Sequence, residues 1–245
     1  MSRQNAQKQP IVSYWGKRAG DFAALRQEEL RSKKAERWKR ELLPFLPRDK
    51  RASILDIGTG SGFFSILLAE EGYENVTGID LTPQMIERAR EMVVGMKNAP
   101  SFYVMDAEKL KFPSESFQAI VTRNLTWTLP HMEQAYGEWY RVLKKNGVLL
   151  NFDANYGNEE EELPKEELPQ NHAHKMISEE LNIEYEKIIK SLPATYMSRP
   201  ARDVEMMKNT GYRRILLDFQ LSDRIYQEVD EFYNPVRMFA IQALK

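Results

Sequence analysis

The sequence predicts one α/β protein built on a doubly wound sheet of about seven strands, mostly parallel, with an antiparallel strand at one edge. Short apolar runs alternate with amphipathic helical segments from residue 54 onward, which is the pattern of repeated βα units. A glycine-rich turn joins the first run to the first helix, and acidic residues end the runs that follow. With 245 residues, 42% of them apolar, the chain can form a substantial core.

The elements follow from these patterns in order. Residues 1–10 are polar and predict an arm, and a basic helical segment follows from Ile11 to about Leu46, where Pro44 and Pro47 end it. The parallel strands are expected at 54–57, 75–80, 101–105, 117–122 and 148–153, and the last two strands at 214–219 and 236–243. Helices are expected at 63–72, 83–97, 130–143, 177–191 and 200–209.

Composition excludes several classes of function. Lys+Arg (35) and Asp+Glu (36) nearly cancel, so the chain lacks the positive excess of a nucleic-acid-binding protein. The absence of cysteine excludes disulfides, thiolate metal sites and cysteine nucleophiles, and it is consistent with the cytoplasm. The polar N-terminus has no signal-peptide core, and no apolar stretch is long enough to cross a bilayer. We therefore expect a cytoplasmic protein without a membrane partner.

The glycine-rich turn after the first strand predicts a ligand site. It reads Asp56-Ile-Gly-Thr-Gly-Ser-Gly62, and a strand, a glycine turn and a helix N-terminus together expose backbone N–H groups to a ligand. The dinucleotide fingerprint G-x-G-x-x-G would require a small residue where Phe63 stands, which disfavours a nicotinamide cofactor. Asp80 ends the second strand about 20 residues later, where related sheets use a carboxylate to bind ribose hydroxyls.

The D-x-G-x-G-x-G pattern resembles the first motif of the class I, Rossmann-like S-adenosylmethionine-dependent methyltransferases. The stretch from Asp106 to Phe117 also resembles a segment of that family, and the core is closest to the branch that includes ubiquinone- and menaquinone-biosynthesis enzymes. In the family, an acid after the third strand binds the adenine amine and the next amide binds a ring nitrogen. The turn after the fourth strand meets the methionine end of the cofactor. The resemblance therefore implies cofactor contacts at Tyr14, Asp56, Gly58, Thr59, Gly60, Gly62, Asp80, Leu81, Asp106, Ala107, Arg123 and Asn124.

The acceptor pocket is expected beside the cofactor. Tyr14-Trp15-x-x-Arg18 resembles the lid of the family, and residues 154–199 interrupt the alternation as an insertion over the carboxyl edge of the sheet. An acidic run, Glu159 to Glu162, lies in this insertion. Its His172-x-His174 pair lacks a third ligand, so we expect no metal site. Candidate acceptor-pocket residues are Trp15, Arg18, Trp127, His131, Asp153, Tyr156 and His172.

These features predict a methyltransferase that moves a methyl group from S-adenosyl-L-methionine to a small-molecule acceptor by in-line displacement, releasing S-adenosyl-L-homocysteine. The attacked atom could be O, N, S or C, and the sequence does not select a catalytic base. The alternatives are an RNA or protein methyltransferase, supported only by the basic segment from Lys33 to Arg40, and a non-catalytic cofactor-binding module. We expect a monomer or homodimer, and no nucleic-acid partner. The expected organisation is a lid (1–46), a cofactor-binding core (47–153), a substrate lobe (154–199) and a C-terminal completion of the core (200–245).

Overall fold

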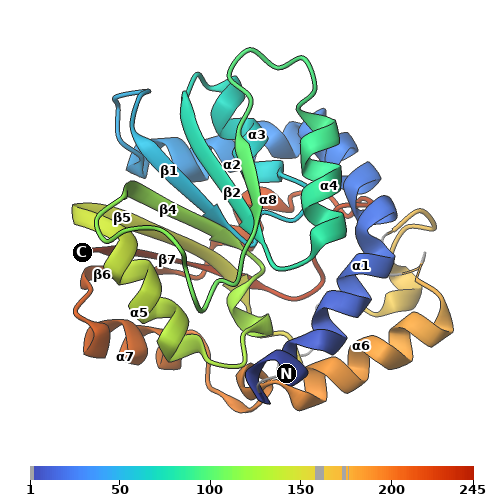
Figure 1. Ribbon diagram of the computed structural model, residues 1–245. Coiled ribbons are helices and arrows are strands. Elements are labelled where there is room, and N and C mark those ends of the chain that lie inside the picture. The colour runs from blue at the N-terminus through green and yellow to red at the C-terminus, as the bar shows by residue number, and fades with distance from the viewer. Residues whose placement is uncertain (1–2, 158–162, 173–174, 176) are drawn as a thin grey trace.

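The computed structural model describes residues 3–157, 163–172, 175 and 177–245. Seven strands form one twisted sheet in the order β3-β2-β1-β4-β5-β7-β6 (Figure 1). Their bounds are β1 Ser53–Ile57, β2 Asn75–Asp80, β3 Ser101–Val104, β4 Phe117–Arg123, β5 Leu143–Ala154, β6 Arg213–Asp218 and β7 Met238–Leu244. β7 runs antiparallel to both β5 and β6, whereas β1 to β5 pair in parallel. The predicted α/β architecture, with its antiparallel pairing at one edge, is confirmed.

The centre of the sheet is apolar on both faces, as a doubly covered parallel sheet requires. Ile54, Leu55 and Ile57 of β1 are fully buried, as are the neighbouring residues Ala119 to Val121 of β4. The strand order reverses between β1 and β4, because β2 and β3 extend to one side and β5 to the other. In open α/β sheets such a reversal opens a crevice at the carboxyl ends of the strands.

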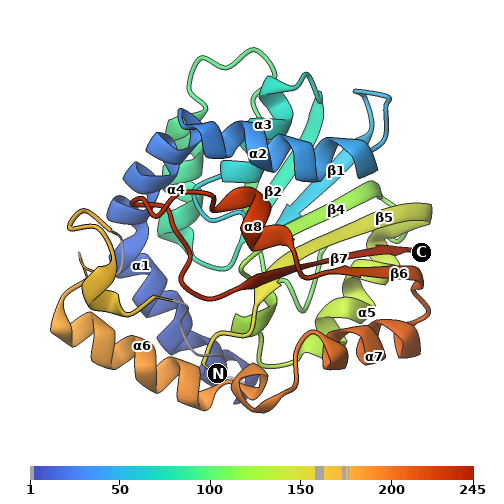
Figure 2. The same cartoon turned by 180° about the vertical axis from the view of Figure 1, so that it is seen from behind.

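Helices cover both faces of the sheet (Figures 1 and 2). On one face, α2 (Lys33–Leu42), α3 (Phe63–Glu70) and α8 (Leu221–Ile225) share an apolar cluster with the strands, and α4 (Pro83–Met92) packs beside α3. On the other face, α5 (Met132–Val142) and α7 (Ala201–Thr210) complete a second cluster around Trp139. Within the described part of the chain, no helix is both long and apolar enough to cross a bilayer.

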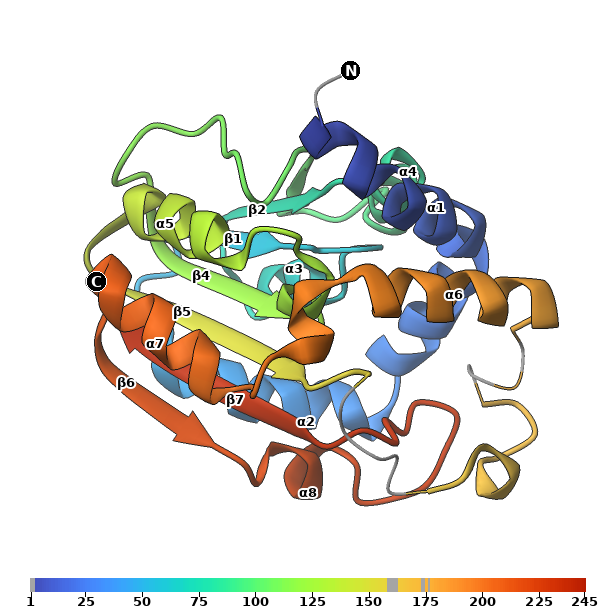
Figure 3. The ribbon, with the colours of Figure 1, turned by 90° about the horizontal axis from the view of Figure 1, so that it is seen from below.

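Two further helices lie across the carboxyl edge of the sheet. α1 (Arg3–Leu30) and α6 (Glu179–Ser191), which comes from the predicted insertion, run side by side there (Figure 3). The expected arm at residues 1–10 was wrong for residues 3–10, which form the first turns of α1 although Pro10 lies inside the helix. The reason is long-range: Lys8 makes ion pairs with Asp106 and Glu108, and these hold that part of the helix against the core.

Candidate functional site

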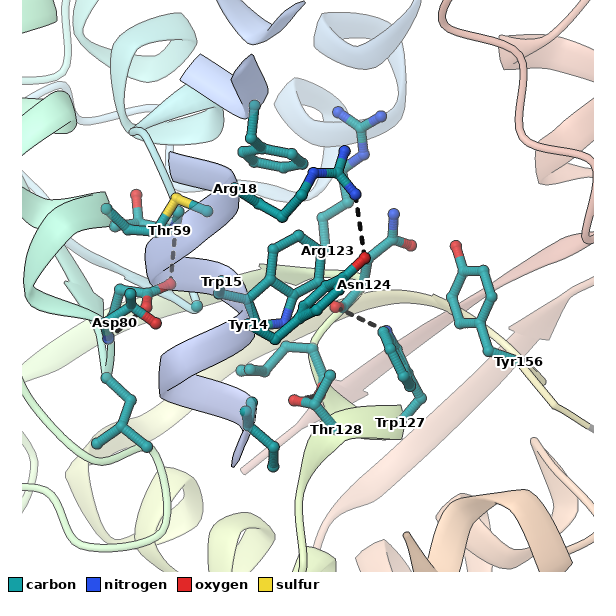
Figure 4. Close-up of a pocket in the computed structure, with 18 of the residues that line it drawn as sticks. Tyr14, Trp15, Arg18, Thr59, Asp80, Arg123, Asn124, Trp127, Thr128 and Tyr156 are labelled. Atoms are coloured by element: carbon teal, nitrogen blue, oxygen red, sulfur yellow. Dashed lines mark hydrogen bonds between the residues drawn. The ribbon is translucent and has the colours of Figure 1, made fainter. Parts of the chain in front are cut away.

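A cavity of about 650 Å³ lies between the carboxyl ends of the strands and the helices α1 and α6. This volume is in the range of small-molecule sites in proteins. Its wall includes most of the residues proposed from the sequence: Tyr14, Trp15, Arg18, Asp56, Gly58, Thr59, Gly60, Asp80, Leu81, Asp106, Ala107, Arg123, Asn124, Trp127, Tyr156 and His172. Figure 4 shows ten of the lining residues with labels. The sheet edge therefore gathers residues that are far apart in the sequence.

The glycine loop between β1 and α3 is shaped by Asp56. Its carboxylate accepts hydrogen bonds from the hydroxyl of Thr59 at 2.6 Å and from the amide and hydroxyl of Ser65 at 3.0 and 2.7 Å. Burial raises the pKa of Asp56 to about 6. Asp56 borders the cavity, but its hydrogen bonds all go to the loop and the start of α3. Its role is therefore to fix the turn that faces the ligand.

The three glycines of the turn do not share one environment. Gly58 and Gly60 border the cavity with φ of 68° and 54°, which side chains rarely adopt. Gly62 is the N-cap of α3 and faces away from the cavity, because a Cβ there would lie 3.1 Å from the ring of Phe102. Gly62 permits close packing of α3 on the sheet and is not part of the cavity wall, and its contact with the cofactor stays a prediction.

Asp80 lies at the end of β2, directly opposite the glycine loop. It accepts hydrogen bonds from the amide of Gly60 at 3.1 Å and from the amide of Thr82 at 2.8 Å. Burial raises its pKa, and these backbone hydrogen bonds oppose the increase. A carboxylate has about four acceptor positions, so Asp80 retains acceptor capacity on the cavity side.

Asp106, after β3, already has a cationic partner. The Nζ atom of Lys8 lies 2.8 and 2.7 Å from its two carboxylate oxygens and 2.5 Å from a carboxylate oxygen of Glu108. Lys8 also lines the cavity, so α1 places an ammonium group where the sequence analysis expected only a carboxylate. The main-chain N–H of Ala107 donates to none of the described residues and is available to a ligand.

His131 does not line the cavity, contrary to expectation. Its backbone N–H donates to Glu108 at 2.7 Å, and its Nδ1 atom lies 3.0 Å from the other oxygen of that carboxylate. Because Glu108 is buried and binds His131 twice, the imidazole remains at the start of α5.

Asp153 is also outside the cavity wall. β5 continues to Ala154, so Asp153 is still within the strand and points toward one face of the sheet rather than beyond its end. There it accepts hydrogen bonds from the side chain of Thr126 and from the amide of Trp127 (3.1 Å), and it forms an ion pair with Arg199. Arg199 also pairs with buried Asp203 of α7. Asp153 therefore fixes the loop that carries Trp127.

Asn124 occupies an uncommon position at the end of β4. Its φ is 54°, its N–H donates to the carbonyl of Phe152 at 2.8 Å, and its carbonyl accepts from the indole of Trp127 at 3.0 Å (Figure 4). Its side-chain oxygen is buried and has no hydrogen-bond partner among the described residues. Strained backbone and unsatisfied buried polar atoms concentrate at functional sites.

Aromatic rings form the wall opposite the glycine loop. Tyr14 lies 5.6 Å from Tyr185 of α6, and Trp127 lies 5.0 Å from Tyr156, between ring centroids. Arg18 donates to the Tyr14 hydroxyl at 3.0 Å (Figure 4). His172 is buried, and its Nε2 lies 2.8 Å from the carbonyl oxygen of Tyr233. His174 and the acidic run 159–162 lie outside the described residues.

Several cavity residues were missed from the sequence. Lys8, Phe22 and Arg26 line the cavity from α1, and Tyr185 does so from α6. The four-residue spacing of Tyr14, Arg18, Phe22 and Arg26 would have placed them on one helix face. The described residues contain no group of three or more His, Cys, Asp or Glu side chains that could hold a metal ion.

An open α/β sheet with a glycine turn and carboxylates along its carboxyl edge defines a Rossmann-like, nucleotide-binding type of protein. Residues 55–151 match the family model of a methyltransferase domain. The chain has the fold of the class I S-adenosylmethionine-dependent methyltransferases, with its methyltransferase domain at those residues.

Comparisons with individual proteins also identify methyltransferases as similar to this chain. The phosphatidylethanolamine N-methyltransferase of Cereibacter sphaeroides is 35% identical over 99 residues, which are 40% of this chain and 48% of that protein. The demethylmenaquinone methyltransferase of Listeria welshimeri is 32% identical over 126 residues, 50% of this chain and 53% of that protein. The structure of phosphoethanolamine N-methyltransferase 2 from Haemonchus contortus with S-adenosyl-L-methionine has a TM-score of 0.60 at 21% identity and covers 87% of this chain and 52% of that one. The chain thus spans about half the length of these relatives.

The cavity fits S-adenosyl-L-methionine by the chemistry of its wall. A Cβ on Gly58 would lie 2.8 Å from Leu125, and one on Gly60 would lie 3.2 Å from Phe22, so bare backbone is needed at both positions. Asp80 offers acceptors for ribose hydroxyls, and Asp106 with the Ala107 amide offers an acceptor and a donor for adenine. The unpartnered oxygen of Asn124 can accept from an amino group.

Proposed function

We propose that this protein is an S-adenosylmethionine-dependent methyltransferase acting on a small-molecule acceptor. The observation that carries the proposal is the cavity itself, in which a glycine turn, Asp80 and Asp106 face an aromatic wall formed by α1, α6 and the loop after β4. When bound, S-adenosyl-L-methionine supplies an electrophilic methyl group on a sulfonium, which an acceptor displaces in line to leave S-adenosyl-L-homocysteine. The protein has to position the acceptor and exclude water.

Each part of the wall has a proposed task. Gly58, Gly60 and Asp80 hold the ribose and the methionine end, and Asp106 with Ala107 holds the adenine. Tyr14 and Trp127 both pack against Tyr185, at 5.6 and 5.9 Å between ring centroids. We keep Tyr14 as a cofactor contact and assign the acceptor to the aromatic region around Trp127. Trp15, Arg18, Tyr156 and His172 complete the proposed acceptor pocket. We assign no general base, because a methyl acceptor that is already unprotonated needs none.

The ribose assignment is tested by Asp80→Asn, with Asp49→Asn as the control. The amides of Gly60 and Thr82 bind different carboxylate oxygens of Asp80, so asparagine keeps one of these hydrogen bonds and loses the charged acceptor. We expect the binding of S-adenosyl-L-homocysteine, measured by calorimetry, to be weaker by about 1–3 kcal/mol of free energy. Asp49 is exposed and should leave affinity unchanged. An unaltered affinity in Asp80→Asn would remove the assignment.

A small-molecule acceptor is favoured over RNA or protein because α1 and α6, which lie side by side in Figure 3, both line the cavity and restrict access to it. A screen of small amines, phenols, thiols and carbon acids for conversion of S-adenosyl-L-methionine to S-adenosyl-L-homocysteine tests this proposal. Turnover only with RNA or a protein would support the macromolecular alternative. Cofactor binding without turnover on any acceptor would support a non-catalytic module.

The remaining proposals concern organisation. We propose that residues 1–46 act as a lid, 47–153 as the cofactor-binding core, 154–199 as a substrate lobe and 200–245 as the completion of the core. We further propose that the protein acts in the cytoplasm as a monomer or homodimer, which fractionation and analytical ultracentrifugation would test. The absence of cysteine is consistent with a reducing compartment.

A further inference from the structure

One face of α1 carries two arginines into the cavity. Tyr14, Arg18, Phe22 and Arg26 follow one another at intervals of four residues, and all four line the cavity. Arg123, at the end of β4, lines it as well, and Figure 4 shows Arg18 and Arg123 reaching into the same pocket. Three guanidinium groups, each charged at any physiological pH, therefore border one cavity.

Only one buried carboxylate neutralises two of these arginines. Arg123 donates to both oxygens of Glu29, at 3.2 and 3.0 Å, and Arg26 pairs with the same carboxylate. The side chain of Glu29 is fully buried, and burial, which would raise its pKa, is outweighed by Arg123 and Arg26, so the pKa of Glu29 is lowered. Glu29 therefore stays ionised and supplies one negative charge for two positive charges.

Glu29 does not satisfy all the hydrogen-bond donors of Arg26 and Arg123. The Nε atoms of both are buried and have no hydrogen-bond partner among the described residues. Burial lowers the pKa of Arg26, and although Glu29 raises it, the neighbouring charge of Arg123 lowers it further. The pair thus retains one uncompensated positive charge and unused N–H donors.

Arg18 adds a second uncompensated charge. It is only 8% exposed, and its hydrogen bond goes to the neutral hydroxyl of Tyr14. Among the described residues, no carboxylate forms an ion pair with it. A buried cation without an anionic partner is unfavourable, so the site favours an anionic ligand.

The acids of the cavity are placed elsewhere. Asp56 binds Thr59 of the glycine loop, Asp80 binds backbone amides, and Asp106 binds Lys8. Glu186 and Glu231 belong to α6 and to the loop before β7, and Glu186 is exposed and pairs with Lys190 at 3.4 Å. The cofactor does not supply the missing charge, since its one carboxylate is accompanied by an ammonium and a sulfonium.

We propose that the methyl acceptor carries an oxyanion, a carboxylate or a phosphate, and that Arg18, Arg26 and Arg123 bind this group. The inference rests on the proposed function, because it assigns the arginine end of the cavity to the acceptor rather than to the cofactor. Guanidinium groups bind carboxylate and phosphate oxygens with paired N–H donors, which suits a site built from three of them.

The test uses full-length protein saturated with S-adenosyl-L-homocysteine. Inorganic phosphate and acetate are titrated separately by calorimetry at constant ionic strength, since chloride would compete for the same charges. We expect saturable binding of at least one of these anions, and the stronger of the two identifies the oxyanion. Arg18→Gln should weaken this binding at least tenfold, whereas Arg31→Gln, at an exposed arginine directly after the end of α1, should not change it.

The variants and outcomes separate the explanations. Arg18→Gln breaks no ion pair within the described residues, and its circular dichroism spectrum should match that of the parent. Anion binding that disappears once S-adenosyl-L-homocysteine is bound would assign the arginines to the cofactor's own carboxylate and overturn the proposal, as would no binding at all. Failure of S-adenosyl-L-homocysteine itself to bind would instead overturn the proposed function.

Discussion

At the scale of single residues, the site depends on side chains that act on the backbone as well as on the ligand. Asp56 has three hydrogen-bond donors around it, all from the loop and helix that follow β1. Asp153 holds the amide of Trp127, and Asp80 holds that of Gly60. Three carboxylates, of which Asp56 and Asp153 are buried, therefore determine the shape of the loops at the rim of the sheet.

The raised pKa of Asp56 predicts a pH-dependent stability. Because its pKa is about 6 in the folded protein and 3.8 ordinarily, the folded state binds this proton more tightly. The resulting stabilisation is complete below about pH 4 and is lost as the pH rises through 6. Asp56→Asn lacks this dependence, so its unfolding free energy relative to that of the parent should rise by about 2–3 kcal/mol between pH 4 and 7. Urea unfolding measured across this range tests the prediction, and parallel pH profiles would contradict it.

The side chain of Asn124 can be removed without backbone strain. Glycine accepts its φ of 54°, so Asn124→Gly should change the free energy of unfolding by less than about 1 kcal/mol. If its free oxygen binds the cofactor, affinity for S-adenosyl-L-homocysteine should fall by about 1 kcal/mol. Asn146→Gly is a matched control, since Asn146 also has positive φ (63°) but lies near the start of β5, outside the cavity wall. Equal affinities for the two variants would exclude Asn124 from the cofactor site.

At the scale of elements, α1 is attached to the sheet at both ends by ion pairs. Lys8 joins its first turns to the end of β3 through Asp106, and Glu29 joins its last turn to the end of β4 through Arg123. Between these points, Tyr14 and Phe22 cover the cavity. The helix is therefore held across the rim as one element.

Removing the charge of Glu29 should detach one end of α1. Glu29→Gln leaves Arg26 and Arg123 buried without an anion, and breaking a buried pair in this way destabilises proteins by roughly 3–5 kcal/mol. Glu28→Gln alters an exposed neighbour on the same helix and should have little effect. Thermal unfolding measures both, and Glu29→Gln combined with Arg26→Met should recover part of the loss. A loss no greater than that of the control would show that the ion pair contributes little.

At the scale of the whole molecule, local patterns were sufficient to predict the sheet and the part of the cavity wall formed by the glycine turn, Asp80 and Asp106. Asp80 is the last residue of β2 and Asp106 lies two residues after β3, and the carboxyl ends of parallel strands meet at one edge. Their placement therefore follows from the strand pattern alone. The glycine turn is equally local, because its residues are consecutive.

The remaining features depend on contacts between distant segments. Lys8 and Asp106 are 98 residues apart, and Arg123 and Glu29 are 94 apart, so only the crossing of α1 over the sheet brings them together. Asp153 was misplaced because β5 is longer than its apolar run indicates, and a residue inside a strand faces the sheet rather than the rim. His131 was misplaced because buried Glu108 binds it.

The path of α1 along the rim also has a kinetic consequence. Phe22 of α1 packs against Gly60 of the glycine loop, and α6 lines the cavity beside the aromatic residues. S-adenosyl-L-methionine should therefore bind before the acceptor, and S-adenosyl-L-homocysteine should be released last. Steady-state measurements should then give an ordered sequential pattern, with S-adenosyl-L-homocysteine competing with S-adenosyl-L-methionine and acting noncompetitively toward the acceptor. Random-order kinetics would indicate that the two compounds reach the cavity by separate entrances.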